Sequence, residues 1–215
     1  MPIPPSRRVG LTDCLSVDTR TQSPTSIKVE VKSRREAVVV ISVLLFLDID
    51  GTLIPFGGPG PHPVYGTSPH PLLPRLDPAL GPRLRALGAE LVWATTWLDD
   101  ANDLLSPWLG LPALPVVRWP DVDDDEGDEG ADEPHGVGLH WKTRSLVEWA
   151  AGRPFVWVDD EISGADRAWV ADRHPGPALL YRVDHRLGLV DADLAALGEW
   201  IGRQGEAQCP GDPVA

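Results

Sequence analysis

The sequence predicts an α/β fold, a doubly wound sheet of five parallel strands with helices on both faces. From residue 37 onward, short apolar runs alternate with helical stretches, which is the pattern of a parallel sheet covered on both sides. The longest apolar run, residues 38–47, is typical of a central buried strand. The chain has 215 residues, enough for one domain of ordinary size, and we expect that domain to span residues 37–203.

Five apolar runs mark the predicted strands, which span residues 38–47, 90–94, 115–119, 155–158 and 178–183. In a doubly wound sheet, right-handed crossovers build outward in one direction before the chain returns to the centre and builds in the other. If the first three strands build one way and the last two the other, the strand order is 5-4-1-2-3. The first and fourth strands are then neighbours, and ligands bind beyond their carboxyl ends.

Start and stop signals place a helix in each connection. Asp77 is a predicted N-cap, Pro78 takes the first helical position, and Gly88 ends this helix. The other helices are expected at residues 99–105, 141–151, 165–172 and 191–203. Asp191 is the predicted N-cap of the last one.

Three segments fall outside these elements. Residues 1–36 mix Pro, Ser, Thr and basic residues without periodicity, and we expect an extension, disordered or outside the core. Residues 204–215 are expected to form a flexible tail. Residues 54–76 are dense in Pro and Gly, so they hold neither a helix nor a central strand. No Gly-Lys-Ser/Thr follows their glycines, which argues against a phosphate-binding loop.

The formal net charge of −13 is concentrated in one loop. Residues 121–133 contain nine acidic and no basic residues, which leaves −4 for the rest of the chain. This acidic tract repels itself and has no apolar periodicity, so we interpret it as a solvated, disordered loop. The negative net charge argues against a broad nucleic-acid-binding surface, because such a surface needs a basic face.

Cysteine and histidine usage disfavours several other classes. Cys14 and Cys209 lie near opposite ends of the chain, so neither a disulfide framework nor a zinc site is expected. The histidines lack the HExxH spacing and are expected at the surface or in capping positions. No secretory signal is visible, and the longest apolar run is about half the length that a bilayer crossing requires. We therefore expect a cytoplasmic protein without a membrane partner.

Carboxylates follow two of the predicted central strands at their carboxyl ends. Asp48 and Asp50 end the first strand, and Asp159 and Asp160 end the fourth. If these strands are neighbours, the four carboxylates converge at one crevice and repel one another unless a cation lies among them. Oxygen ligands of this kind suit Mg²⁺. A turn or helix-capping role stays open for any single aspartate, but it does not account for the four together.

Lys142 is the only lysine after residue 36, in a chain that has 16 arginines. A compact ammonium can neutralise a carboxylate and a phosphoryl oxygen together in a tight site, which a broad guanidinium cannot. The alternative is a solvent-exposed lysine on a helix. The second strand is followed by Thr95 and Thr96, whose hydroxyls would lie beside the end of the first strand, within reach of a phosphoryl oxygen.

Together these residues resemble the four motifs of the haloacid dehalogenase (HAD) superfamily. The motifs occur in order on the expected elements, with residues 48–52 (DIDGT) as motif I, Thr95 as motif II, Lys142 as motif III and Asp159-Asp160 as motif IV. The resemblance covers about residues 43–203 and implies a Rossmann-like fold. Residues 91–97, with residues 157–161, are also similar to the HAD domains found with bacterial RNA-repair proteins.

The resemblance implies a Mg²⁺-dependent phosphatase that forms an aspartyl-phosphate. Asp48 would be the nucleophile, and Asp50 would protonate the leaving group and then activate water. Thr95 and Lys142 would position and neutralise the phosphoryl group. Further substrate contacts would come from Gly51, Thr52 and Thr96. The metal ligands would come from Asp48, the Asp50 main-chain carbonyl, Asp159 and Asp160, and which of the last two binds directly stays open.

The two gaps in which the superfamily carries its cap domains hold only residues 54–76 and the acidic tract. The chain thus resembles capless members, which tend to act on large substrates such as phosphoproteins or nucleic-acid ends. An acidic tract beside the crevice would repel a long polyanion. We therefore hypothesise that it favours small or basic-flanked phosphorylated substrates, and that nucleic acid is a substrate only through an end phosphate.

Two other functions fit the same residues. A phosphotransferase or mutase would use the same aspartyl-phosphate, but the chain lacks a cap that would retain an intermediate. A non-catalytic phosphate-binding module predicts no Mg²⁺-dependent turnover and is disfavoured because every expected catalytic position is filled. In the superfamily, a second aspartate like Asp50 is typical of phosphatases and phosphomutases, which disfavours carbon–halogen cleavage.

Overall fold

The computed structural model describes residues 29–30, 38–39, 42–58, 61–120 and 138–207. Its centre is a four-stranded sheet in the order β4-β3-β5-β6, with every pair parallel. The strands are β3 (Leu44–Leu47), β4 (Glu90–Trp93), β5 (Phe155–Asp159) and β6 (Ala178–Arg182). β3 pairs with β4 on one side and with β5 on the other. The first and fourth predicted strands are therefore neighbours, as expected.

The central strands alternate between two apolar layers, because successive side chains of a strand point to opposite faces. In β3, Leu45 and Leu47 belong to one layer, whereas Leu44 and Phe46 belong to the other. All four side chains are fully buried. β3 is therefore packed on both faces, which fixes the position of the residues that follow it.

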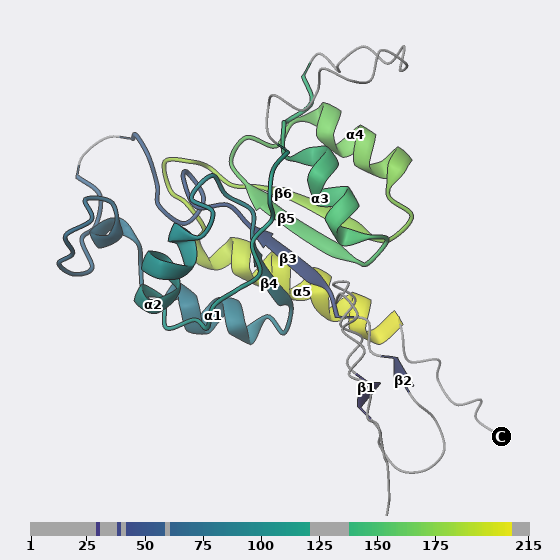
Figure 1. The fold of residues 1–215 in the computed structure, drawn as a ribbon, viewed down its shortest axis with the longest axis horizontal. Coiled ribbons are helices and arrows are strands. Elements are labelled where there is room, and N and C mark those ends of the chain that lie inside the picture. The colour runs from purple at the N-terminus through teal and green to yellow at the C-terminus, as the bar shows by residue number, and fades with distance from the viewer. Residues whose placement is uncertain (1–28, 31–37, 40–41, 59–60, 121–137, 208–215) are drawn as a thin grey trace, which may run out of the picture.

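Helices cover both faces of the sheet (Figure 1). The first layer is covered by α1 (Leu80–Ala86), the π-helical segment η2 (Ala101–Leu105), α2 (Ser106–Trp108) and α5 (Asp191–Ala207). The second layer is covered by α3 (Thr143–Ala150) and α4 (Gly164–Arg173). α4 begins with a capping box, in which Ser163 and Asp166 each accept a hydrogen bond from the other's backbone N–H, satisfying donors that a helix start leaves unpaired.

The prediction of a fifth strand at residues 115–119 is wrong. The chain forms only one parallel bridge there, between Trp93 of β4 and Val116. The Trp93 N–H donates to the Pro115 carbonyl and the Val117 N–H donates to the Trp93 carbonyl, each at 2.9 Å. Pro115 has no N–H to donate and Pro120 follows, so the ladder does not lengthen. In the numbering of the prediction, the described sheet has the order 5-4-1-2.

Several other elements differ in extent from their predictions. The predicted strand at residues 38–47 is divided, because Val38–Val39 is β2, which pairs antiparallel with β1 (Val29–Glu30), and β3 begins only at Leu44. The last helix continues to Ala207 instead of ending at residue 203. Between β3 and α1 the described chain contains one short 3₁₀ helix, η1 (Leu73–Arg75), so the described part of this gap holds no cap domain.

Some predictions fall on residues outside those described. These are the acidic tract, Cys14, Cys209, the tail after residue 207 and residues 1–36 apart from β1. Within the described ranges, no helix is both long and apolar enough to cross a membrane.

Candidate active site

A tight loop after β3 orients Asp48 and Asp50. Asp48 follows β3 directly, and its N–H donates to the Val158 carbonyl of β5 (3.2 Å). Three successive N–H groups then converge on the Ile49 carbonyl, those of Thr52 (3.2 Å), Leu53 (2.8 Å) and Ile54 (2.9 Å). The loop is thus fixed by its own backbone hydrogen bonds and by the neighbouring strand.

Gly51 allows this loop to approach the end of β5. Its φ is +74°, a left-handed conformation that glycine adopts without steric cost. A Cβ atom at this position would lie 2.5 Å from the Asp160 carboxylate, which is closer than non-bonded atoms tolerate. Glycine therefore brings the Asp48 loop and the Asp160 side chain together. Whether Gly51 also contacts substrate stays a prediction.

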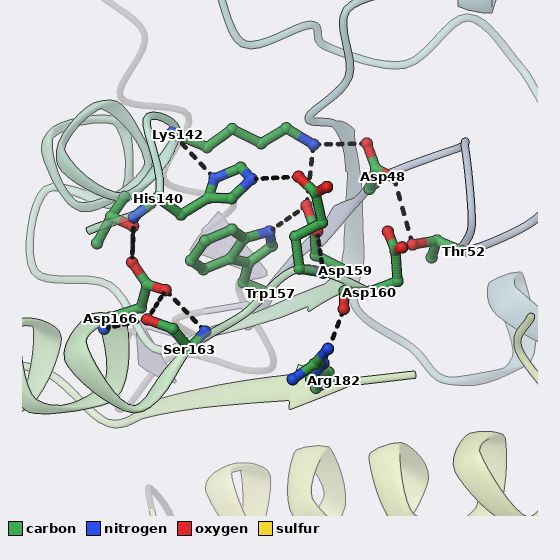
Figure 2. A network of polar contacts seen from close by, with 12 residues as sticks. Asp48, Thr52, His140, Lys142, Trp157, Asp159, Asp160, Ser163, Asp166 and Arg182 are labelled. Atoms are coloured by element: carbon green, nitrogen blue, oxygen red, sulfur yellow. Dashed lines mark hydrogen bonds and ion pairs between the residues drawn. The ribbon is translucent and has the colours of Figure 1, made fainter. Parts of the chain in front are cut away.

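Lys142 bridges the acidic ends of β3 and β5 (Figure 2). Its Nζ donates to Asp48 Oδ1 at 2.5 Å and to Asp159 Oδ2 at 2.9 Å. The three side chains are only 5%, 8% and 2% exposed. An ammonium is stable in such a place only because carboxylates compensate its charge. The alternative of a solvent-exposed lysine is therefore excluded.

Three carboxylates can direct oxygens into one common space. One oxygen from each of Asp48, Asp159 and Asp160 lies within 4.8 Å of the other two. Three carboxylates and the Lys142 ammonium leave a net charge of −2 when all are ionised, which a divalent cation would neutralise. Carboxylate oxygens are the donors that Mg²⁺ prefers, so these residues fit the expected ion. The Asp50 carboxylate is outside this group.

Burial and crowding of like charges shift the pKa values of the cluster. Burial is the largest influence on Asp48 and raises its pKa to about 7, a rise that Lys142 opposes and Asp159 reinforces. Burial alone would lower the pKa of Lys142, but Asp48 and Asp159 outweigh it, so the lysine pKa is raised and the ammonium stays charged. Burial, followed by the charge of Asp159, also raises the pKa of Asp160. The raised carboxylate pKa values mean that the ionised forms are unfavourable side by side, and a bound cation would favour those ionised forms.

The two carboxylate oxygens of Asp50 differ, because one accepts a hydrogen bond and the other has no partner among the described residues. Trp97 Nε1–H donates to Asp50 Oδ2 at 2.9 Å. Asp50 Oδ1 is buried and has no hydrogen-bond partner among the described residues, although buried oxygens of this kind are usually paired. An oxygen in this state can exchange a proton with a bound molecule.

The predicted threonines take different positions. Thr52 Oγ1 donates to Asp48 Oδ2 at 3.3 Å and so helps to hold that carboxylate. Thr96 lines the pocket described below. Thr95 is buried, and its Oγ1 accepts from the Trp97 N–H at 3.4 Å. The structure thus brings Thr52 and Thr96 to the site, whereas Thr95 does not line the pocket.

The four strand-end aspartates and Lys142 line one pocket, which has a volume of 260 Å³. It is lined by Asp48, Asp50, Phe56, Thr96, His140, Trp141, Lys142, Asp159, Asp160 and Glu161. Its volume is below the roughly 300–1,000 Å³ of sites for drug-sized ligands, which suits a phosphoryl group and the part of a molecule attached to it. Two larger pockets, of 670 and 480 Å³, lie elsewhere and contain none of the four strand-end aspartates.

His140 is a site residue that the sequence did not indicate. Its Nδ1 accepts a hydrogen bond from the Lys142 backbone N–H at 3.2 Å. Because a backbone amide can only donate, the ring proton is on Nε2, which lies 3.2 Å from Glu161 Oε2. Of the predicted surface or capping roles, the surface role is wrong here, since the His140 side chain is only 8% exposed, whereas its contact with the backbone N–H at the start of α3 is a capping contact. Its position two residues before Lys142 was the available signal.

Asp166 anchors the turn that carries Lys142. Its carboxylate accepts hydrogen bonds from the His140 N–H (2.7 Å), Thr143 Oγ1 (2.6 Å) and Ser163 Oγ (2.6 Å). Burial alone would raise the pKa of Asp166, but these hydrogen bonds outweigh it and the pKa is lowered. On the other side, Trp157 Nε1–H donates to Asp159 Oδ2 at 3.2 Å. The lysine and its partner carboxylate are thus both held by buried groups (Figure 2).

The parallel sheet, the acidic ends of its two central strands and the lysine between them are the arrangement expected of a HAD domain. Residues 44–194 match the family of the HAD domain in Swiss Army Knife RNA repair proteins. The chain belongs to that family, which confirms both the superfamily and the RNA-repair type. Searches of curated proteins and of solved structures found no match.

Proposed function

We propose that the protein is a Mg²⁺-dependent phosphatase that hydrolyses a terminal phosphate on a nucleic acid through an aspartyl-phosphate on Asp48. The observation that carries this proposal is the buried bridge of Lys142 to Asp48 and Asp159 beside the carboxylate of Asp160. A structural ion pair needs one partner for each charge, whereas here one cation faces three carboxylates.

The first step would transfer the phosphoryl group to the protein. An Asp48 carboxylate oxygen attacks phosphorus, and the bond from phosphorus to the leaving oxygen breaks. Lys142 and Thr52 each hold one Asp48 oxygen, which fixes the carboxylate for in-line attack. Asp50 gives its proton to the leaving oxygen from Oδ1, because Oδ2 is held by Trp97.

The second step would release inorganic phosphate. Asp50, now ionised, accepts a proton from water, whose oxygen attacks phosphorus. The bond between phosphorus and the Asp48 oxygen breaks, and the carboxylate is restored. Lys142 stays charged throughout and neutralises the phosphoryl oxygens. Mg²⁺ held by Asp48, Asp159 and Asp160 would mask the charge of both carboxylate and phosphate, so that the two anions can approach.

Two observations support a nucleic-acid end as the substrate. The family is described by its occurrence in RNA repair proteins. The described part of the first cap position holds no cap domain, so a chain end of a polymer can reach the pocket. The pocket itself accommodates an end group and not the body of a duplex, because its volume is 260 Å³.

The test is hydrolysis of p-nitrophenyl phosphate and of trinucleotides with a 5′- or 3′-terminal phosphate. We expect turnover that requires Mg²⁺ and stops with EDTA. Asp48→Asn should lower kcat by roughly 10⁴-fold or more, as expected for a lost nucleophile. Asp50→Asn should lower it less on p-nitrophenyl phosphate, because nitrophenolate leaves without a proton.

Three outcomes would contradict the proposal. If Asp48→Asn is as active as the wild type, Asp48 is not the nucleophile. Binding of phosphate without any Mg²⁺-dependent turnover would favour a non-catalytic module. Transfer of phosphate to added alcohols in preference to water would favour a phosphotransferase. A control substitution, Trp169→Ala in α4, lies away from the pocket and should leave turnover unchanged.

A further inference from the structure

Two aromatic side chains line the pocket. Neither has a role in the phosphoryl transfer proposed above. Phe56 and Trp141 line the pocket together with the catalytic aspartates. Trp141 is 51% exposed and is the largest of the exposed apolar side chains among the described residues. Exposed apolar residues are common on proteins, but Trp141 is distinguished by its fixed orientation and by its distance from the phosphoryl-binding lysine.

Neighbouring rings hold Trp141 in place. The Trp119 ring meets it edge-on, with centroids 4.7 Å apart and planes at 76°, and the His140 ring stacks on it at 5.5 Å and 28°. Trp119 is itself fixed, because its Nε1–H donates to the Thr95 carbonyl at 3.1 Å. Trp141 is therefore oriented before any ligand arrives, so little conformational entropy is lost when a flat group stacks on it.

The Trp141 ring lies close to the place where the phosphoryl group would bind, between Lys142 and Asp48. Lys142 Nζ is 5.4 Å from the centre of the Trp141 ring and 2.5 Å from Asp48 Oδ1. A phosphate that contacts Lys142 and Asp48 therefore has Trp141 beside it. In a nucleotide, only a sugar separates the phosphate from a flat aromatic base, which is the group that a tryptophan face binds by stacking.

The charges of the pocket disfavour recognition of a polyanionic backbone. Among the described lining residues, Lys142 is the only lysine or arginine, and five carboxylates surround it. Binding of many phosphates requires a row of cations. A neutral base is not repelled by these carboxylates, so stacking supplies binding free energy that electrostatics cannot supply here.

We propose that Trp141, supported by Trp119 and His140, is a base-stacking platform that binds the terminal nucleotide of the substrate. This inference rests on the proposed function, since it assigns the part of the substrate next to the phosphate that Asp48 attacks. The site would thus recognise one phosphate and one base, and would make no use of the more distant phosphates of the chain.

The experiment compares two substrates that differ only in the terminal base. One is a phosphorylated trinucleotide, with the phosphate on whichever end the wild type hydrolyses, and the other has an abasic residue at that end. Kinetics are measured with the full chain and Mg²⁺ for the wild type, Trp141→Ala, Trp141→Phe and the control Trp169→Ala. Trp169 is a suitable control because its ring is contacted by Arg144 and Arg173 on another surface.

We expect Trp141→Ala to raise KM for the base-bearing trinucleotide by about 5- to 150-fold, the range for loss of one stacked base, with kcat little changed. The abasic substrate should have a high KM in every variant. Trp141→Phe should recover most of the loss, because phenylalanine also offers a flat face. The affinity should depend weakly on salt, and the logarithm of the binding constant should fall with the logarithm of the salt concentration with a slope of about −0.7 for a single cation. An equal effect on both substrates, an unchanged KM or a much steeper slope would overturn the platform.

Failure of the platform can be separated from failure of the proposed function. If the wild type hydrolyses no phosphorylated trinucleotide, the proposed function on nucleic-acid ends fails, and the platform is then tested by calorimetric binding of base-bearing and abasic trinucleotides, each with the phosphate at the 5′ or the 3′ end. Weaker binding of the base-bearing trinucleotide to Trp141→Ala, with no change for the abasic one, would still support stacking. Equal binding of both trinucleotides by the wild type would refute it.

Discussion

Two clusters of charged residues lie at opposite ends of the central strands, and they differ in balance and burial. At the amino ends of β3, β4 and β5, Arg153 pairs with Glu90 at 2.6 Å and also donates to the Ser42 carbonyl at 3.1 Å. One cation there meets one anion, and their side chains are 24% and 34% exposed. At the carboxyl ends, one buried cation faces three carboxylates.

The two clusters differ as a structural ion pair differs from a candidate ligand-binding site. The Arg153 cluster is charge-balanced and joins the starts of three strands, which explains it without any ligand. The Lys142 cluster is unbalanced, and desolvation makes that imbalance costly. A bound cation, or protonation of a carboxylate, relieves such an imbalance. Replacement of each cation by methionine should therefore give different results at the two ends.

The largest effect is expected for Lys142→Met. Removal of the lysine leaves Asp48 and Asp159 buried without their cation, so the free energy of unfolding should fall by about 3 kcal/mol, as for other broken buried pairs. The measurement is urea unfolding in EDTA at pH 8. Phosphatase activity should fall by about 10²- to 10³-fold, because one stabilising donor is lost. Unchanged stability in EDTA would show that the carboxylates need no cation and would remove the contrast between the two ends.

A smaller effect is expected for Arg153→Met, the matched change at the other end. This pair is partly exposed, so its loss should lower the free energy of unfolding by about 1 kcal/mol. Because Arg153 is at the end of the sheet away from the pocket, kcat/KM on the phosphorylated trinucleotide should equal that of the wild type. A loss of activity comparable to that of Lys142→Met would mean that the two ends are coupled.

A third prediction concerns the stability of the protein at acid pH and a histidine at the amino end of the sheet. His174 Nε2 donates to the Arg153 carbonyl at 3.0 Å, and its Nδ1 is buried without a partner among the described residues. Burial lowers the pKa of His174, and its hydrogen bond to the carbonyl only partly opposes this. The unfolded chain therefore binds the proton more readily than the folded protein. The contribution of neutral His174 to the free energy of unfolding is fully present above the unfolded pKa of about 6.5 and is lost as the pH falls through the lower folded pKa.

His174→Gln tests whether His174 causes the loss of stability at acid pH. The glutamine amide does not titrate, and it can still donate to the Arg153 carbonyl. The wild type should lose at most about 1.4 kcal/mol per pH unit from this group, and the variant should show a flatter profile between pH 7 and pH 5. Urea unfolding at several pH values measures both. Parallel profiles would assign the acid sensitivity to other groups.

Much of the site could be predicted because it depends on local pattern. The Asp48 and Asp159 positions follow from apolar strands that end in acids, and the lysine was indicated by its rarity in the chain. The failed fifth strand shows the limit of that reasoning. Residues 115–119 are apolar enough for a strand, but pairing also requires N–H groups in register, and Pro115 provides none.

The roles of the supporting residues could not be predicted in this way. Asp166 lies at the start of a predicted helix, yet it also receives hydrogen bonds from His140 and Thr143, more than twenty residues earlier in the chain. Likewise, Trp157 lies in a predicted strand and is buried, but its ring N–H also donates to Asp159. These contacts depend on how helices pack on the sheet.

The sequence by itself determined the fold class and the polar ends of the two central strands, because backbone periodicity and turn residues act over a few positions. Only the tertiary structure decided that Lys142 bridges Asp48 and Asp159, and that the Trp119 ring packs against Trp141. Lys142 and Asp48 are 94 residues apart. Their 2.5 Å contact arises because β3 and β5 pair as neighbours and α3 packs on the same face of both strands, which no local pattern encodes.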